Sequence, residues 1–219
     1  MKLPSVLSIY KALYEIYGSQ NWWPGDGWLE ISLGAVLTQN TSWTNVARAI
    51  DNLKKSELLD LLKLLNAKPD YVKLLIKPVG FFNVKYKRLI NLLEYFKLHE
   101  SNMNRFSVLP LTRLRGELLE INGIGPETAD SILLYAFNRL IFVVDAYTRR
   151  LFNRLGYSWM GEVSYKEIQN FFMWEIPSDV NIYNEYHALI VVHCKNFCKK
   201  KPLCSDCRIS SICTFSIQT

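Results

Sequence analysis

The stretch LLEINGIGPETAD, residues 118–130, decides the fold that we expect for this chain. It joins two segments whose apolar residues recur with helical spacing, Leu114–Ile121 and Pro126–Phe137. Gly123 and Gly125 lie between them on either side of one apolar residue, and glycine adopts turn conformations that are costly for other residues. The second segment begins with proline, which suits a first helical turn because the amide that it lacks there would have no partner. The stretch predicts two helices joined by a tight hairpin.

Such a hairpin would bind an anion. Its exposed amides and the N-terminus of the second helix form a ready-made anion site, which can hold a DNA phosphate without reading sequence. We expect Ile124 to pack between the two helices, and Gly123, Ile124, Gly125 and Thr128 to form the DNA-binding turn. The alternative is an ordinary helix–helix turn, since turns of this kind often contain glycine.

The composition is that of a globular protein with a basic excess. Of 219 residues, 49% are hydrophobic and 21% charged, and the net charge is +6 with a pI near 9.0. The length allows one large domain or two small ones, and the charge suits a polyanionic partner without requiring one. No stretch approaches the roughly 18–20 apolar residues of a membrane span, and the start MKLPSV does not resemble a signal peptide. We expect a cytoplasmic protein, associated with the nucleoid in a prokaryote.

Helical periodicity runs along almost the whole chain, and strand-like alternation is nearly absent, so we predict an all-α fold. The expected helices are Ser5–Tyr17, Trp28–Leu37, Thr44–Leu53, Ser56–Leu65, Tyr71–Ile76, Val84–Leu98, Leu111–Ile121, Pro126–Phe137, Ala146–Leu155, Tyr165–Trp174 and Val180–Val192.

Several motifs in the same order make the chain similar to the endonuclease III (helix-hairpin-helix-GPD) superfamily of DNA glycosylases. They are the hairpin stretch, VVDAYTRR at 143–150, LGAVLTQNT at 33–41, GFFNVK at 80–85 and the C-terminal cysteines. The resemblance implies a two-lobed fold, with a six-helix barrel over residues 26–139. Residues 1–25 and 140–219 would form the second lobe with a four-cysteine cluster loop. It also implies a monomer that acts on double-stranded DNA containing a damaged base.

Asp145 is the first candidate catalytic residue. It follows four apolar residues and precedes a helical segment, so it can serve simply as an N-cap. The resemblance implies a second role, because the aspartate at this family position is the essential carboxylate. It would stabilise positive charge developing on the sugar or activate water.

Glu127 is the second candidate, and it departs from part of the family. Bifunctional members carry a lysine at this position, whose amine forms a Schiff base with the sugar and leads to strand cleavage. A carboxylate cannot form that imine. We therefore expect base removal without lyase activity, unless another lysine replaces the missing amine. Glu127 can also be only a first-turn acid that complements the helix dipole.

The segments NWWP at 21–24 and TSW at 41–43 resemble those of the small 3-methyladenine DNA glycosylases, which also have glutamate at the Glu127 position. That resemblance implies that Trp22 and Trp43 sandwich the flipped base, with Trp23 and Pro24 as walls. Electron-rich rings attract a cationic alkylated base by about 1–2 kcal/mol each. The alternative is that these tryptophans are ordinary core residues.

An enzyme that extrudes a base must fill the gap it leaves. Gln39 and Asn40 resemble the residues that do so in the family, and Phe81 matches the position of an intercalating wedge. Alternatively, Gln39 and Asn40 cap the next helix, and Phe81 packs inward. We expect Lys85, like its basic neighbours, to be solvated charge rather than a specific contact.

All five cysteines lie between residues 194 and 213, and such clustering in an intracellular chain points to a metal. The spacing Cys198-x5-Cys204-x2-Cys207-x5-Cys213 resembles the family's iron–sulfur loop, with a first gap one residue shorter. It implies a [4Fe–4S] cluster, and zinc is the chemical rival. Cys194 is left over as a buried thiol. The three histidines, His99, His187 and His193, show no paired spacing and are expected to be structural.

Three functions follow from this sequence. The first is a monofunctional glycosylase for a damaged, alkylated base such as 3-methyladenine. The second is a bifunctional glycosylase and lyase for oxidised pyrimidines. The third is a DNA-binding module without turnover.

Overall fold

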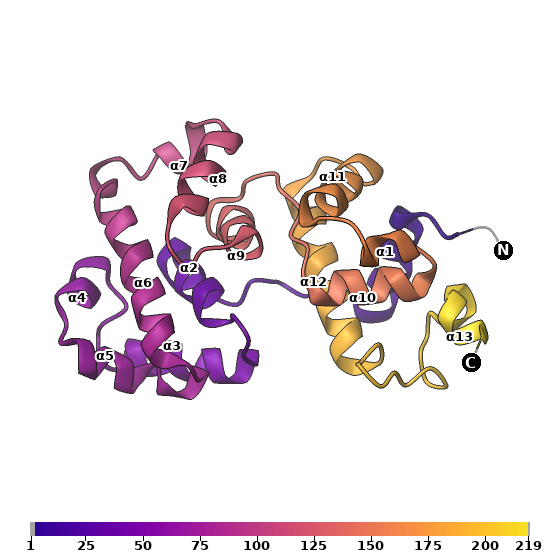
Figure 1. The fold of residues 1–219 in the computed structure, drawn as a ribbon, viewed down its shortest axis with the longest axis horizontal. Helices are drawn as coiled ribbons and strands as arrows, with labels where there is room; N and C mark the ends of the chain where they lie inside the picture. Colours follow the sequence, from indigo (N-terminus) through magenta and orange to yellow (C-terminus); the bar gives the residue numbers. More distant parts are fainter. Residues whose placement is uncertain (1–2, 219) are drawn as a thin grey trace. The chain divides into compact units, whose positions relative to one another are not determined.

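The computed structural model describes residues 3–218, and all regular structure within that range is helical (Figure 1). This confirms the all-α prediction. The α-helices are α1 (Val6–Tyr17), α2 (Gly27–Leu37), α3 (Trp43–Lys55), α4 (Leu61–Asn66), α5 (Pro69–Leu75), α6 (Phe82–Lys97), α7 (Arg105–Val108), α8 (Leu111–Glu120), α9 (Pro126–Ser131), α10 (Ala146–Leu155), α11 (Tyr165–Glu175), α12 (Val180–Asn196) and α13 (Thr214–Gln218). Short 3₁₀ turns are η1 (Lys77–Val79), η2 (Glu100–Asn102), η4 (Ser158–Gly161) and η5 (Ser210–Ile212), and η3 (Ile132–Ala136) is a π-helical continuation of α9.

Most helix starts agree closely with the predicted ones, and α1, α10, α11 and α12 begin at a side-chain N-cap. One start was wrong: the segment predicted from Ser56 becomes helical only at Leu61. Glu57 has a left-handed φ of 53°, which interrupts a helix. Asp60 then acts as the N-cap, because its carboxylate accepts the Lys63 amide at 2.9 Å.

The chain divides into two compact units, one formed by Pro24–Arg139 and the other by Met1–Trp23 with Leu140–Thr219. In the first unit the long helix α6 packs against α2, α4 and α5, and α2 also packs against η3 (Figure 1). The core of this unit is mostly apolar; its buried side chains include Leu33, Val36, Leu89, Leu92, Phe96, Phe106, Leu114, Leu118 and Ile132.

In the second unit α12 is the central helix, and both α1 and α10 pack on it. Its core is rich in aromatic rings. Phe142 and Phe172 stack with centroids 4.4 Å apart, and Tyr186 is fully buried with its hydroxyl donating to the Val6 carbonyl at 2.7 Å. Such buried rings stabilise a core strongly, since each removes a large apolar area from water. Among the described helices, none combines the length and apolar character of a membrane span.

Candidate active site and nucleic-acid interface

The predicted hairpin forms between α8 and α9. Gly123 has φ of 94°, a backbone conformation that favours glycine. A Cβ there would also lie 2.3 Å from the Cγ of Arg88, so steric contact excludes a side chain as well. Ile124 is 4% exposed and packs inward as expected. Gly125 differs from the expectation: its φ is −91°, and a Cβ would meet nothing within 4 Å. The fold of the free chain therefore does not by itself require glycine at this position.

A buried ion pair holds the two hairpin helices together. The guanidinium of Arg115 on α8 donates to both carboxylate oxygens of Asp130 on α9, at 2.7 and 3.2 Å. Asp130 is fully buried, and bidentate pairing with arginine satisfies both of its oxygens. This ion pair joins the two hairpin helices in the free protein.

Gln39, just after α2, is tied to this hairpin. Its side-chain nitrogen donates to the Gly123 carbonyl at 3.1 Å and to the Thr128 hydroxyl at 2.9 Å. Its side-chain oxygen accepts a hydrogen bond from Arg88 on α6. Gln39 therefore links three elements of the unit instead of capping the next helix, at whose N-cap position Ser42 stands. Asn40 beside it is exposed, with φ of 54°.

Phe81 stands at the start of α6 with φ of 44° and a side chain that is 77% exposed. The alternative that Phe81 packs inward was therefore wrong. A large apolar side chain at a fixed helix start, projecting into solvent, has the placement that a wedge between bases would need.

Lys85 is a correction to the sequence prediction, because it is buried at 2% exposure rather than solvated. Its ammonium donates to the carbonyls of Leu37, at the end of α2, and Val79, at the end of η1, at 2.8 and 2.9 Å. Positive charge suits such sites because the last carbonyls of a helix are unpaired and negative. Burial lowers the pKa of Lys85 to about 8. One lysine thus joins the loops that carry Gln39 and Phe81.

The predicted base-pocket residues fall in both units. Pro24 and Trp43 line a pocket of about 530 Å³ empty volume, together with Glu30, Asp51 and Lys54 among others. Glu30 is buried there and pairs with Lys54 at 2.8 Å. In the other unit, the Trp22 and Trp23 rings meet edge to face with centroids 5.4 Å apart. Lys195 lies 6.0 Å from the Trp22 ring centroid. The sandwich of a base between Trp22 and Trp43 stays a prediction.

Asp145 caps α10 with one carboxylate oxygen. Oδ1 accepts the Thr148 backbone amide at 2.7 Å and the Thr148 hydroxyl at 2.8 Å, which completes a capping box. Oδ2 lies 3.5 Å from Nε2 of His187 on α12, and the Asp145 side chain is about 10% exposed. Burial by itself would raise the pKa of the Asp145 carboxyl, but His187 and Thr148 outweigh it and hold this pKa below its usual range.

Sequence reasoning placed Asp145 at a helix start and missed its partner. His187 is 42 positions away in the sequence and is buried on α12. The helical pattern over residues 180–192 predicted this helix but could not indicate which of its residues meets Asp145. Glu127, the other candidate, is exposed in the first turn of α9, where an acid complements the helix dipole.

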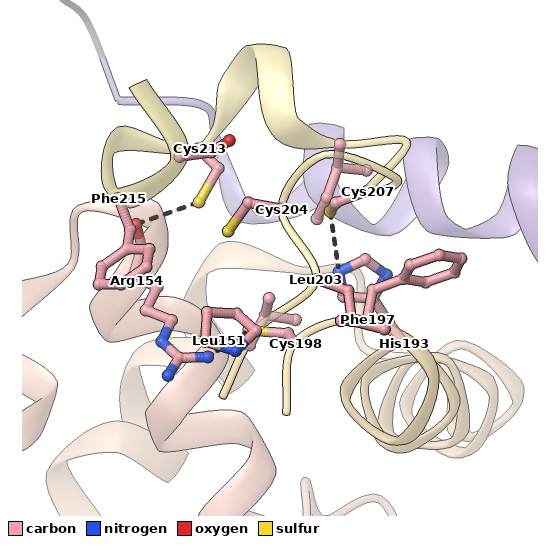
Figure 2. A pocket seen from close by; sticks show the side chains of 13 residues that line it. Leu151, Arg154, His193, Phe197, Cys198, Leu203, Cys204, Cys207, Cys213 and Phe215 are labelled. Carbon is pink, nitrogen blue, oxygen red and sulfur yellow. Dashed lines mark hydrogen bonds between the residues drawn. The ribbon is translucent and has the colours of Figure 1, made fainter. Parts of the chain in front are cut away.

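The four predicted ligand cysteines line one pocket of about 310 Å³ empty volume, whose other walls are mostly apolar (Figure 2). Arg154 donates to the Cys198 sulfur at 3.3 Å, and the His193 ring nitrogen lies 3.6 Å from the Cys207 sulfur. Cys194 is buried but is not part of the lining. Within residues 3–218, no three side chains of the histidine, cysteine and acidic types are placed to hold a single metal ion.

Two arginines of α10 hold the cysteine loop by its backbone. Arg150 donates to the Cys198 carbonyl at 2.8 Å, and Arg154 donates to the carbonyls of Lys199 and Lys200 at 2.7 and 3.0 Å. The sequence carries no local signal for these contacts, which join positions more than 40 residues apart. They stabilise the loop that brings the four thiols to one pocket.

A helical fold over the described residues, with a hairpin between α8 and α9, an aspartate that caps α10 and a four-cysteine loop, defines a recognisable class. Residues 33–177 match the HhH-GPD superfamily base excision DNA repair protein family. The chain belongs to this superfamily, and it is a DNA glycosylase of base excision repair.

Named relatives agree with this assignment. The chain is 50% identical over 214 residues to the "Putative DNA repair glycosylase MJ1434" of Methanocaldococcus jannaschii, covering 97% of each chain. The structure of the Helicobacter pylori 3-methyladenine DNA glycosylase MagIII bound to 1,N6-ethenoadenine is similar, with a TM-score of 0.77 and 29% identity over 88% of this chain and 98% of that one. A non-covalent endonuclease III–DNA complex shares the fold, with a TM-score of 0.79 at 18% identity over 97% and 95% of the two chains.

Proposed function

We propose that this protein is a monofunctional DNA glycosylase that flips a damaged, alkylated base out of double-stranded DNA and hydrolyses its N-glycosidic bond. The observation that carries the proposal is the state of Asp145. Its carboxylate is nearly buried, is fixed through Oδ1 by Thr148, and is kept ionised with Oδ2 directed to His187.

This arrangement suits the chemistry of base loss. Breaking the bond between the sugar C1′ and the base nitrogen leaves positive charge on the sugar. A pre-oriented carboxylate in a poorly hydrated site stabilises that charge, or accepts a proton from the attacking water. A base that already carries positive charge leaves as a neutral molecule, so a single carboxylate suffices without a separate general acid.

The hairpin supports a phosphate contact. Gly125 needs neither a left-handed backbone nor relief from a steric clash in the free chain. Glycine at such a position is typical of a backbone that another group approaches closely. The amides around it precede α9, whose N-terminus favours an anion. A DNA phosphate fits this chemistry, with Gly123, Ile124 and Thr128 in the supporting turn and with Asn40 and Phe81 exposed in the same unit.

The preference for an alkylated base is supported by aromatic residues and by one relative. Trp22 and Trp23 adjoin one another, and Trp43 and Pro24 line one pocket. Aromatic faces favour a cationic base. The structural relative with 29% identity is a 3-methyladenine DNA glycosylase.

Glu127 supports the absence of lyase activity. The residue is exposed at the start of α9, and its carboxylate cannot attack the sugar to form an imine. The abasic strand should therefore remain intact after the base leaves.

The cysteine pocket fits a [4Fe–4S] cluster, held by Cys198, Cys204, Cys207 and Cys213. Four thiols around one mostly apolar pocket match the donor set, and Arg154 would stabilise the Cys198 thiolate. Zinc, held by the same four thiols, is the chemical rival. When bound, the cluster would cross-link the C-terminal loop.

A panel of duplexes, each carrying one damaged base, tests the proposal. We expect base release from duplexes with 3-methyladenine, and strand breaks only after alkali. Base release confined to oxidised pyrimidines, or a covalent adduct after borohydride reduction, would establish a bifunctional enzyme instead. No release from any duplex, despite tight binding, would establish a DNA-binding module.

A further inference from the structure

We infer that His187 is a positioning residue for base release, which orients the Asp145 carboxylate and keeps it ionised in acidic solution. This inference rests on the proposed function, in which Asp145 is the catalytic carboxylate. It adds a role for a histidine that the sequence marked only as structural.

The first support is that the two carboxylate oxygens of Asp145 have different partners. Thr148 supplies both hydrogen bonds to Oδ1, through its amide and its hydroxyl. A carboxylate held at one oxygen can still rotate about that contact. Nε2 of His187 lies 3.5 Å from Oδ2, within ion-pair distance of the second oxygen. The two partners come from different helices, α10 and α12, and together they fix the plane of the carboxylate.

The second support is burial. The side chains of Asp145 and His187 are 10% and 7% exposed, so neither is well hydrated. A buried carboxylate without a partner takes up a proton, because burial penalises its charged form. Nε2 must carry a hydrogen to face a carboxylate oxygen, in the neutral and in the charged ring alike. His187 therefore favours the ionised carboxylate in either state.

The surroundings of Asp145 contain titratable groups besides His187. The other titratable groups that interact with this carboxylate electrostatically are Tyr147 on α10 and Cys194 and Lys195 on α12. Tyrosine and cysteine bring no positive charge. Lys195 acts on Asp145 through charge alone, whereas Nε2 of His187 lies 3.5 Å from the carboxylate oxygen Oδ2.

The test compares single-turnover base release across pH for His187→Met and His187→Gln, measured on the full-length protein with a 3-methyladenine duplex. Methionine fills the space without a donor, and glutamine restores an N–H. We expect the acid limb of the His187→Met profile to move upward by about one to two pH units. In His187→Gln it should return towards the wild-type position. His99→Met, which removes a histidine from the other unit, is the matched control and should leave the profile unchanged.

If the role of His187 is purely structural, both His187 variants should slow base release by the same factor at every pH and leave the acid limb of the profile unmoved. That result would overturn the inference. The pKa of a ¹³C-labelled Asp145 carboxyl, measured by NMR, provides a readout independent of activity and should rise in His187→Met. An unchanged pKa would also overturn the inference. If that pKa rises but the acid limb of base release does not move with it, the Asp145→Asn variant shows which claim is wrong. Base release by Asp145→Asn at the wild-type rate would refute the proposed function, and loss of release would refute only the role of His187.

Discussion

The side-chain amide of Gln39 donates a hydrogen bond to the hydroxyl of Thr128 at 2.9 Å, across 89 positions of sequence. The same amide reaches the Gly123 carbonyl, and its oxygen accepts from Arg88. The residue proposed to fill the gap in DNA is thus held, in the free protein, by the hairpin proposed to bind the phosphate. Filling the gap requires Gln39 to exchange these contacts for contacts with bases, so the two parts of the interface are energetically linked.

Removing these contacts should destabilise the Pro24–Arg139 unit. We predict that Gln39→Ala lowers the free energy of unfolding by about 1–3 kcal/mol, because it leaves polar groups of the hairpin unpaired. Denaturant unfolding measures this. Asn40→Gly is the control, since Asn40 is exposed with a positive φ that glycine tolerates, and it should change stability by less than about 0.5 kcal/mol. Equal effects of the two substitutions would contradict the assigned network.

Lys85 should make stability depend on alkaline pH. Its pKa is lowered to about 8 in the folded protein and returns to 10.5 on unfolding. The unfolded chain therefore binds more protons between these values, and this lysine makes stability rise with pH through that window. Relative to Lys85→Met, the wild-type free energy of unfolding should gain on the order of 2 kcal/mol from pH 8 to 10.5. Parallel curves for the two proteins would show that Lys85 titrates normally.

Asp145→Asn should separate capping from catalysis. Asparagine is as good an N-cap as aspartate, so the helix should remain stable. The uncharged amide cannot stabilise a cationic sugar, and base release should fall by about 10²–10⁴-fold. Asp179→Asn makes the same exchange at the N-cap of α12, where Asp179 accepts the Asn181 amide at 2.7 Å, and should retain activity. Similar losses in both variants would indicate that capping alone matters.

Phe81→Ala should affect DNA distortion and leave folding unchanged. The side chain is 77% exposed, so its loss should alter the free energy of unfolding by less than about 0.5 kcal/mol. Base extrusion, followed by 2-aminopurine fluorescence next to the lesion, should slow markedly because nothing then wedges the stack. Leu98→Ala removes an equally exposed side chain, 78%, from the other end of α6. That variant should extrude the base at the wild-type rate.

The cysteine pocket predicts which thiol is dispensable. Cys204→Ser should lose bound iron and the visible absorbance of the cluster in anaerobic preparations, because Cys204 lines the pocket. Cys194→Ser should retain both, since Cys194 lies outside the lining. Zinc in place of iron in wild-type protein, purified without added metal, would contradict the cluster assignment.

The sequence by itself determined the features that depend on neighbouring residues. The start of α10 is set by Asp145 and the residues beside it, and α9 begins at Pro126 as its position after two glycines predicts. The grouping of the cysteines and the identity of Glu127 are also local. Turn chemistry, capping and helical periodicity act over a few positions, so a linear pattern records them.

Only the tertiary structure decided which distant groups meet. Lys85 lies among basic residues, a pattern typical of a solvent-exposed surface. In the folded chain, however, its ammonium donates to the carbonyls that end α2 and η1. His187 lies on a helix that the sequence predicted, but its pairing with Asp145 depends on how α10 and α12 pack. The periodicity of a helix indicates which face is buried, but it does not indicate the partner across the interface. Which residues meet depends on the register and the angle at which the two helices pack, and many local sequences are compatible with each packing arrangement.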